Sequence, residues 1–471
     1  MPSSTQLLWP DALTIGEAGR LSLDGCDLES LARERGTPLW AISRSTVEGN
    51  FDRLLGAFRS RYDRCEIAYS IKAHNTLAVI RLLHRRGAKI DASAEFEFQL
   101  ALAAGVPPAD IILNGNGKSR VALESAARLA IQQVNVDSLD EAQRLEAAAA
   151  ELGVRVSCLV RVQLTYRELL AADPSFESTL RIGEGKFGSN LASGQALETV
   201  DAVLAAPHLD LLGLSHHVGF SGYMGDYTPE REVMHHRECT RELCSFANEL
   251  RRTRGVQVQR LDLGGGFRTG HRVLLSTPGA AADLSVHPLP SEEEYAAAVF
   301  DTLETELEVD EAPLVQFETG GYQIANAVLM LVEVSEVKTV RSTPDAHRYV
   351  TVDGSMMMFV SRGMMRVGHP VVPVADPLRE PARILTDVVG QTCVYDSVAE
   401  DIRLPDVEPG DVLALLHQGA YCETESTQFN AFPRPEVVLV DDGRATVVKR
   451  RETIADVHMR DVVPLEVGAT A

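Results

Sequence analysis

Apolar and polar positions follow a repeating pattern from residue 38 onward. Short apolar runs end in small or polar residues, and helix-like segments such as SAEFEFQLALAAG and SLDEAQRLEAAAAELG separate them. In chain order the runs are PLWAIS (38–43), EIAYSIKA (66–73), AKIDAS (88–93), DIILNG (110–115), QQVNVDS (132–138), RVSCLVRV (155–162), LLGLSHHV (211–218), VQRLDLGGG (258–266) and LVQFETG (314–320). Strands that alternate with helices in this way indicate βαβ units and a parallel sheet.

The number of apolar runs favours a barrel over an open sheet. If PLWAIS is a lead-in strand, the remaining runs suffice to close a (β/α)8 barrel. The alternative is a doubly wound open sheet, but no Gly-x-Gly-x-x-Gly motif follows an early strand. We therefore predict the α/β fold class, with a (β/α)8 barrel over residues 38–320.

The pattern changes after about residue 325. The stretches AVLMLVEVSEVKTV, HRYVTVDGS, DVLALLHQGAY and PEVVLVDDGRATVVKR are β-rich, contain Asp-Gly pairs and have no clear helices between them. They predict a mostly antiparallel β domain over residues 321–471. Residues 1–37 lack the barrel pattern and are expected to join this β domain. The aperiodic residues 268–292 are expected to form an insertion loop.

Composition and charge exclude several classes of protein. The chain has 471 residues, of which 45% are hydrophobic and 24% charged, as is typical of a soluble globular protein with more than one domain. The formal net charge of −22 argues against nucleic acid or an anionic membrane surface as a partner. The seven cysteines contain no Cys-x-x-Cys pair, and there is no metal-ligand spacing, secretory signal or bilayer-spanning run. We expect a cytoplasmic protein without a metal.

Polar residues or glycines stand at the end of almost every predicted strand. In a (β/α)8 barrel the carboxyl ends of the strands build the active site, so these residues are expected to form one site. In chain order they are Lys72, Asp91, Asn116 with Lys118, Asp137, Arg161, His217, the run Gly264-Gly265-Gly266, and Glu318.

Lys72 lies at the end of an apolar stretch. Burying an ammonium group is costly unless the group is paired or loses its proton. A lysine that loses its proton is a nucleophile, and it can form a Schiff base with a carbonyl cofactor. The alternative is a lysine whose amine reaches solvent from the end of a strand.

The glycine run points to a phosphate. Backbone N–H groups without neighbouring side chains can bind an anion, although an ordinary glycine-rich turn is the alternative. A lysine and a phosphate nest together suggest pyridoxal 5′-phosphate (PLP), which also needs a flat side chain against its ring and an acid at its ring nitrogen. His217 and Glu318 suit these roles; the alternatives are a core histidine and an exposed carboxylate.

At this point the motifs resemble a known family, the fold-type III PLP-dependent decarboxylases, which include the ornithine, diaminopimelate and arginine decarboxylases. The matching motifs occur in family order over about residues 40–440. They are YSIKAHN, DASAEFEFQL, NGNGKS, VNVDS, GKFG (185–188), LSHHVG, LDLGGGF, ETGGYQIANA, VDGS (352–355), GQTCVYD (390–396) and GAYCETESTQFNAFPRPE (419–436).

The resemblance implies an alanine-racemase-like barrel with a β domain, and a homodimer that shares its active sites. Catalytic roles are implied for Lys72, His217 and Cys393, where Cys393 comes from the other subunit and returns a proton to the substrate. Asp396 and Arg362 are expected near the substrate. The residues expected to bind PLP are Lys72, Asp91, Glu97, Arg161, His217, Gly264, Gly265, Gly266, Glu318 and Tyr421.

The chain departs from the family pattern in two places near the cofactor. The usual Glu-Pro-Gly-Arg is here ETGG, so that the arginine that helps to hold the phosphate is replaced by Gly321. We hypothesise that Arg268, directly after the glycine run, supplies the missing charge. The usual serine after His-Val-Gly is Phe220, with Ser221 next.

A third departure concerns the substrate. The acidic residue that follows the cysteine in diaminopimelate and ornithine decarboxylases is here Val394, which cannot pair with an ammonium group. This difference resembles the siderophore and antibiotic branches, which decarboxylate larger amino-acid conjugates, and we expect that activity. The alternatives are a diaminopimelate or ornithine type of decarboxylase, a racemase with Tyr395 or Tyr421 as second base, and a non-catalytic regulator. We expect His235 and His236 to be solvated helix residues.

Overall fold

The computed structural model describes residues 12–16, 18–174, 185–218, 228–268, 273–274, 289–341, 346–359 and 367–462. The chain divides into two compact units. One comprises Thr46–His271 and Val286–Ala325, and the other comprises Met1–Ser45, Arg272–Ser285 and Asn326–Ala471. Among the described helices, none combines the length and the apolar character that a bilayer span requires.

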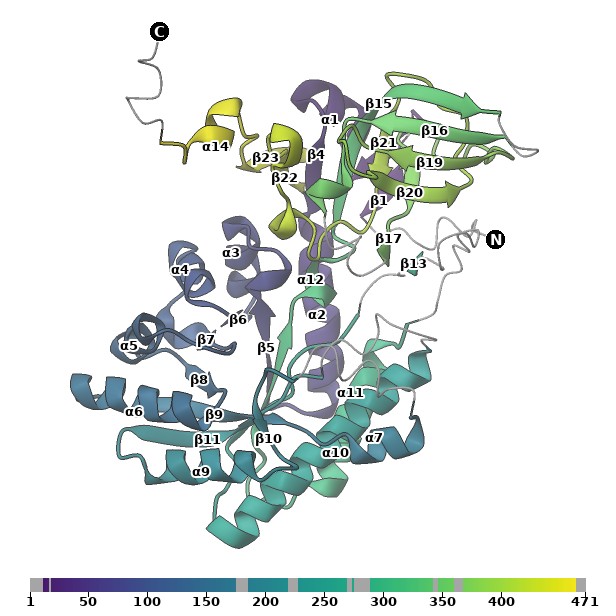
Figure 1. The fold of residues 1–471 in the computed structure, drawn as a ribbon. Helices are drawn as coiled ribbons and strands as arrows, with labels where there is room; N and C mark the ends of the chain where they lie inside the picture. The colour runs from purple at the N-terminus through teal and green to yellow at the C-terminus, as the bar shows by residue number, and fades with distance from the viewer. Residues whose placement is uncertain are drawn as a thin grey trace. The chain divides into compact units, whose positions relative to one another are not determined.

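Eight parallel strands close into a barrel in the first unit (Figure 1). They are β5 (Cys65–Ser70), β6 (Lys89–Ala92), β7 (Ile111–Leu113), β8 (Gln133–Val136), β9 (Val156–Gln163), β11 (Leu209–Ser215), β12 (Arg260–Asp262) and β14 (Leu314–Thr319). The β8–β9 and β14–β5 pairings complete the ring, and the short β10 (Ser189–Asn190) extends the end of β9. Each predicted barrel strand after PLWAIS is confirmed.

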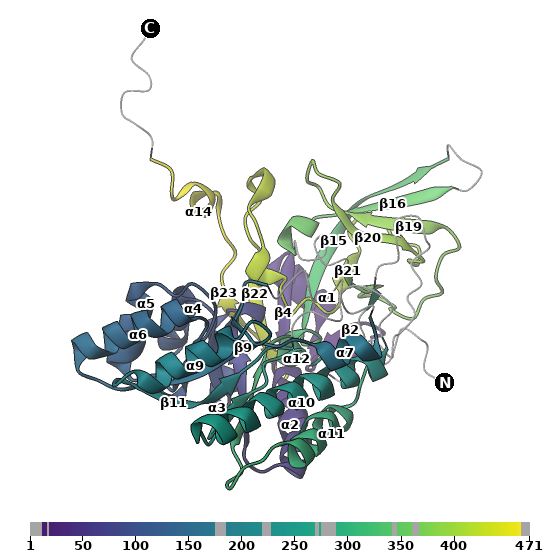
Figure 2. The ribbon, with the colours of Figure 1, turned by 60° about the horizontal axis from the view of Figure 1, so that its bottom comes forward.

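Helices surround these strands in both views of the fold (Figures 1 and 2). They are α2 (Arg44–Arg61), α3 (Leu77–Arg85), α4 (Glu95–Ala103), α5 (Arg120–Leu129), α6 (Leu139–Leu152), α7 (Arg167–Ala172), α9 (Gln195–Ala205), α10 (Pro229–Arg254), α11 (Glu292–Glu306) and the single turn α12 (Gly321–Ile324). Local signals set their ends. The Ser138 hydroxyl accepts from the Glu141 N–H at the start of α6, and Gly153 ends that helix with a φ of 64°.

The second unit is β-rich, as predicted. Its main sheet contains β4 (Leu39–Ser43), β15 (Val328–Val340), β16 (His347–Val352), β18 (Val371–Pro373), β19 (Leu385–Val389), β20 (Ser397–Ile402), β21 (Val412–Leu415), β22 (Glu436–Asp441) and β23 (Arg444–Lys449). The Asp442-Gly443 turn joins β22 to β23, and both residues have positive φ angles, as a two-residue hairpin turn requires. The helices α1 (Leu28–Arg35) and α14 (Ile454–His458) flank the sheet in sequence.

The strand β4, which the sequence suggested as a lead-in to the barrel, lies in this second sheet. It pairs antiparallel with β15 and parallel with β22. All five of its residues are buried, so the apolar run itself carries no sign of which sheet it joins.

The N-terminal segment packs within the same unit. It forms a small antiparallel sheet of β1 (Leu13–Ile15), β2 (Leu21–Leu23) and β3 (Cys26–Asp27). Leu21, Leu23 and Leu28 join a buried cluster with Leu329 and Val438, so apolar burial holds this segment to the β domain. Within the expected insertion loop, β13 (Val273–Leu274) pairs with β17 (Val367–Gly368), and residues 269–272 and 275–288 lie outside the described part.

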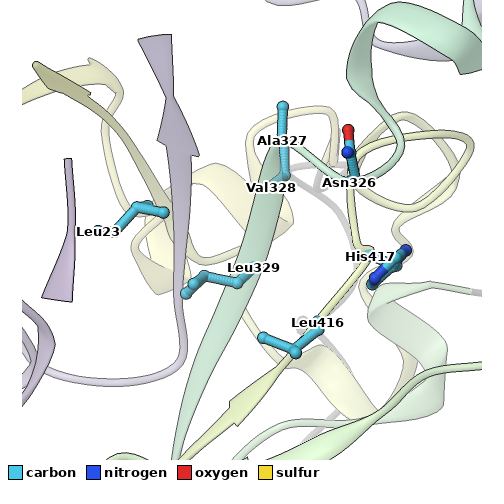
Figure 3. A pocket seen from close by; sticks show the side chains of 7 residues that line it. All are labelled: Leu23, Asn326, Ala327, Val328, Leu329, Leu416 and His417. Carbon is cyan, nitrogen blue, oxygen red and sulfur yellow. The ribbon is translucent and has the colours of Figure 1, made fainter. Parts of the chain in front are cut away.

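A small hollow in the second unit is shown in Figure 3. Its lining side chains belong to Leu23, Asn326, Ala327, Val328, Leu329, Leu416 and His417. The lining is mainly apolar and contains none of the residues predicted to bind a cofactor, so this hollow is part of the packing of the sheet.

Candidate active site

Lys72 lies directly after β5, in the short 3-10 helix Ile71–Ala73. Its Nζ is 3.7 Å from Asp91 Oδ2 and donates to Ser93 Oγ at 3.4 Å. The Lys72 side chain is 37% exposed, whereas that of Asp91 is completely buried. The amine is therefore accessible at the carboxyl end of the barrel and has a buried counter-ion beside it.

Asp91, on β6, is fixed by neighbours on both sides. Ser70 Oγ donates to its Oδ2 at 2.7 Å, and Asn114 Nδ2 lies 3.3 Å from its Oδ1. These bonds hold the carboxylate towards Lys72, which allows it to stabilise a cationic amine in that position.

Glu318, on β14, is buried inside the barrel and is not the exposed carboxylate of the alternative interpretation. Its Oε1 accepts from the side-chain amides of Asn114 and of Asn135, the latter at 3.1 Å. Burial is the main cause that raises the pKa of Glu318 well above its usual range, and the nearby charges of Asp262 and Asp91 raise it further.

Asp262, on β12, is the second buried acid of this cluster. Asn135 Nδ2 also donates to its Oδ2 at 3.1 Å, and the Gly264 N–H donates to its Oδ1 at 3.0 Å. Burial raises the pKa of Asp262 to about 6. One asparagine amide therefore joins two buried carboxyl groups.

The glycine run lies against the ends of two strands. A Cβ atom on Gly264 would lie 2.6 Å from the His216 carbonyl oxygen, and one on Gly265 would lie 2.4 Å from the Glu318 carbonyl oxygen. Only glycine fits at these two positions. Among the described residues, no partner is seen for the N–H groups of Gly265 and Gly266, so both are suited to an anion.

His217 follows β11 and lies beside the glycine run. A Cβ on Gly265 would lie 3.3 Å from its Nε2. Burial is the main cause that lowers the pKa of His217 well below its usual range, and the charges of Lys72 and Arg161 lower it further. The ring is therefore neutral and flat at neutral pH.

Two further predicted residues lie in the same unit. Arg161, on β9, stacks over the Phe187 ring at 4.6 Å, and its Nη1 lies 3.5 Å from Asn114 Oδ1. Glu97, near the start of α4, accepts from the Ser93 N–H at 2.6 Å, and burial raises its pKa. Hydrogen bonds to Asn114 and Ser93 thus connect both side chains to the Lys72 and Glu318 groups.

Comparison with known proteins identifies this arrangement. The family model for the pyridoxal-binding domain of pyridoxal-dependent decarboxylases matches residues 48–325. The chain belongs to this decarboxylase family. The diaminopimelate decarboxylase of Mycobacterium tuberculosis is 32% identical over 463 residues, which cover 97% of this chain and 98% of that protein. The enzyme of the same name from Methanothermobacter thermautotrophicus is 30% identical over 470 residues, 97% and 99% of the two chains.

A solved structure gives the same result. The diaminopimelate decarboxylase of M. jannaschii in co-complex with L-lysine has a TM-score of 0.83 and 26% identity, covering 97% of this chain and 98% of that chain. The protein is therefore a PLP-dependent amino-acid decarboxylase with an alanine-racemase-like barrel and a C-terminal β domain.

The barrel residues fit PLP. The glycine run leaves space that a Cβ would fill, with N–H groups for a phosphate. The accessible Lys72 amine suits the aldehyde, and the buried Glu318 suits a ring nitrogen because an acid there can exchange a proton with it.

Cys393 and Tyr421 belong to the second unit. Cys393 is exposed, and its Sγ donates to Asn430 Oδ1 at 3.3 Å. Tyr421 is partly buried and has a φ of 59°. Arg362, Phe220 and Ser221 lie outside the described residues.

Asp396 is buried, and its carboxylate is occupied within the protein. It accepts from Ser355 Oγ at 2.8 and 2.9 Å, from the Met356 N–H at 2.7 Å, and from the N–H and hydroxyl of Thr392 at 3.0 and 2.5 Å. These bonds fix the loop that carries Cys393, so the geometry favours a positioning role for Asp396 over contact with a substrate.

The prediction for two histidines of α10 is wrong. His235 and His236 are 0% and 2% exposed, and burial lowers the pKa of each to about 3. His236 stacks on Phe267 with a centroid distance of 4.4 Å. The long helix α10 carries many charged residues, so its buried face could not be recognised from the sequence pattern.

Sequence analysis found no metal-ligand spacing, but three residues of one sheet approach each other. Ligand atoms of His347, Asp387 and Asp401 lie within 4.8 Å of one another. Asp387 Oδ1 lies 3.2 Å from His347 Nε2 and accepts from the Asp401 N–H at 2.8 Å. The Asp387 carboxylate therefore already has its partners within the sheet.

Sequence analysis missed Asn114, Asn135 and Asp262. Each stands in or directly after a strand that is otherwise apolar. Parallel barrel strands are buried on both faces, so a polar side chain in such a strand must find a partner inside. Polar residues within otherwise apolar strands are therefore the sequence signal that identifies Asn114, Asn135 and Asp262.

Proposed function

We propose that this decarboxylase acts on a diamino acid of the diaminopimelate type. The observation that carries the proposal is the similarity to diaminopimelate decarboxylases over almost the whole length of both chains. A relative of the same name is recorded with L-lysine, which is the compound left when diaminopimelate loses one carboxyl group. This proposal replaces our first expectation of a larger conjugate.

We assign the binding roles as follows. Lys72 would hold the cofactor covalently, the N–H groups of the glycine run would bind its phosphate, and Glu318 would serve its ring nitrogen. The resemblance alone assigns Tyr421 to the phosphate as well. His217 would provide a flat, uncharged side chain for the ring of the cofactor. Asp91, Glu97 and Arg161 line the space around these groups. When bound, PLP supplies an aldehyde for an amine and a ring that accepts the electron pair released with CO2.

The protein groups handle protons and orientation. Asp91 Oδ2 and Ser93 Oγ lie beside the Lys72 amine and would remain its partners whenever that amine is protonated. Cys393 returns a proton to Cα, and Asn430 orients its thiol. We propose that Cys393 does this across a homodimer interface.

Val394 favours a second candidate substrate. It is 38% exposed and follows Cys393, where an acid would bind a distal ammonium group. A valine there suits an amino-acid conjugate whose far end carries no amine.

CO2 release from a set of substrates separates the two candidates. The purified PLP-loaded protein is given diaminopimelate, ornithine, lysine and carboxylate-rich amino-acid conjugates in parallel. Release from diaminopimelate supports the main proposal. Release from a conjugate alone would favour the second candidate, and release from none of them would contradict both.

A further inference from the structure

Two buried acids face each other through one amide group. Glu318 and Asp262 lie on the neighbouring strands β14 and β12 and are 4% and 0% exposed. Asn135 Nδ2 lies 3.1 Å from Glu318 Oε1 and 3.1 Å from Asp262 Oδ2. Both carboxyl groups therefore converge on the same point in the barrel.

Among the charges that act most strongly on Glu318, two are acids, Asp262 and Asp91, and one is a cation, Lys72. Asp91, from β6, adds a third carboxyl group beside Glu318. Lys72 already pairs with Asp91. Arg260, at the start of β12, also acts on Asp262, but its Nη1 is bonded to Gln133. In a buried site, like charges this close retain a proton.

We propose that Asp262 is a positioning residue that forms a proton-sharing pair with Glu318, with Asn135 holding the two carboxyl groups together. The pair stores one proton at the residue to which we assign the ring nitrogen, and its net charge is then −1. With PLP bound, the pair could supply this proton to the ring nitrogen; the pair would then carry a charge of −2, of which the protonated ring would offset one. This inference rests on the proposed role of Glu318.

Asp262 also connects the two ends of the cofactor site. Its Oδ1 accepts from the Gly264 N–H at 3.0 Å, and the Glu318 N–H donates to the Gly264 carbonyl at 2.9 Å. The proton-sharing pair and the phosphate-binding run are therefore held by the same residue. The raised pKa values of Glu318 and Asp262, which follow from burial, agree with a retained proton.

Infrared spectroscopy of the cofactor-free protein tests the proposal directly. A protonated carboxyl group absorbs separately from a carboxylate, and difference spectra between wild type and variants assign the band. We expect a band at pH 7 that is lost in Glu318→Gln. In Asp262→Asn its titration midpoint should fall by about one pH unit or more, because the like charge is gone. Asn at position 262 keeps an acceptor for Gly264, so a purely structural role would leave the midpoint unchanged.

Asp137→Asn is the matched control, because it removes another buried carboxyl group from a strand end without a bond to Glu318. The infrared band of the protonated carboxyl group should persist in Asp137→Asn. An unchanged midpoint in Asp262→Asn, or no band that titrates above pH 6 in the wild type, would overturn the proposal. The wild-type titration decides the question even if a variant fails to fold.

PLP binding, followed by absorbance, is measured on the same samples. If the wild type shows the band but does not bind PLP, the proposed function fails while the proton-sharing pair stands. If it binds PLP without the band, the pair fails and the proposed function stands.

Discussion

The Arg268 guanidinium lies 3.3 Å from the Glu232 carboxylate, and these side chains are only 8% and 4% exposed. The Tyr295 hydroxyl donates to the same carboxylate and accepts from the Arg268 N–H at 3.3 Å. Arg268 therefore has a buried counter-ion beside the glycine run. We propose that Arg268 also supplies the charge that Gly321 lacks, and variants can distinguish this role from the ion pair with Glu232.

Breaking the ion pair is expected to cost stability. Arg268→Met leaves the Glu232 charge buried without its cation and should lower the free energy of unfolding by about 3–5 kcal/mol. The double variant Arg268→Met with Glu232→Gln should recover most of that loss. Urea unfolding and PLP affinity are measured on both variants. Weak PLP binding that persists in a stable double variant would assign Arg268 to the phosphate.

The buried histidines predict acid sensitivity. His216, His235 and His236 have pKa values of about 3 because of burial, whereas an unfolded histidine titrates near 6.5. As the pH falls below about 6.5, the unfolded chain binds protons that the folded chain does not, so stability decreases, by up to about 1.4 kcal/mol per pH unit for each histidine. Thermal unfolding from pH 7 to pH 4 should show this decrease.

A variant tests whether the buried histidines cause this pH dependence of stability. His235→Leu should remove the contribution of one buried histidine, and the variant His458→Leu, at an exposed histidine, is the control. An identical pH dependence in His235→Leu and the wild type would show that His235 does not contribute.

The glycine run predicts a steric effect on cofactor binding. A Cβ on Gly265 would lie 2.4 Å from the Glu318 carbonyl oxygen, so Gly265→Ala must displace the run from the strand end. We expect PLP affinity to fall by about tenfold or more, as a displacement cost of about 1–3 kcal/mol implies. Gly56→Ala, in α2 with open space around the Cβ, is the control and should bind PLP normally. Equal PLP affinities in Gly265→Ala and Gly56→Ala would refute the assignment of the glycine run to the phosphate of PLP.

Cys393 is expected to control protonation. Cys393→Ala removes the exposed thiol that donates to Asn430 and should slow product formation or divert it towards a transaminated product. Product analysis by mass spectrometry measures this, with Cys26→Ala as the control. Unchanged rate and product in Cys393→Ala would remove this residue from the mechanism.

Sequence alone predicted the barrel strands and the lysine, glycine run, histidine and glutamate at their ends. These features are local, because apolar runs mark strands and the chain order fixes which ends meet. The placement of β4 was not predictable in this way, since the same buried pattern suits either sheet. Asn135 and Asp262 are 127 residues apart in sequence, and their bond depends on barrel closure. The buried face of α10 likewise becomes visible only through its packing.

The decisive measurement is the conversion of diaminopimelate to lysine by the PLP-loaded protein. We expect equal amounts of CO2 and lysine from the wild type, and none from Lys72→Ala, because that variant lacks the amine beside Asp91 to which we assign the covalent link with PLP. Turnover that survives in Lys72→Ala, or a wild-type protein that binds PLP but releases no CO2 from diaminopimelate, would contradict it.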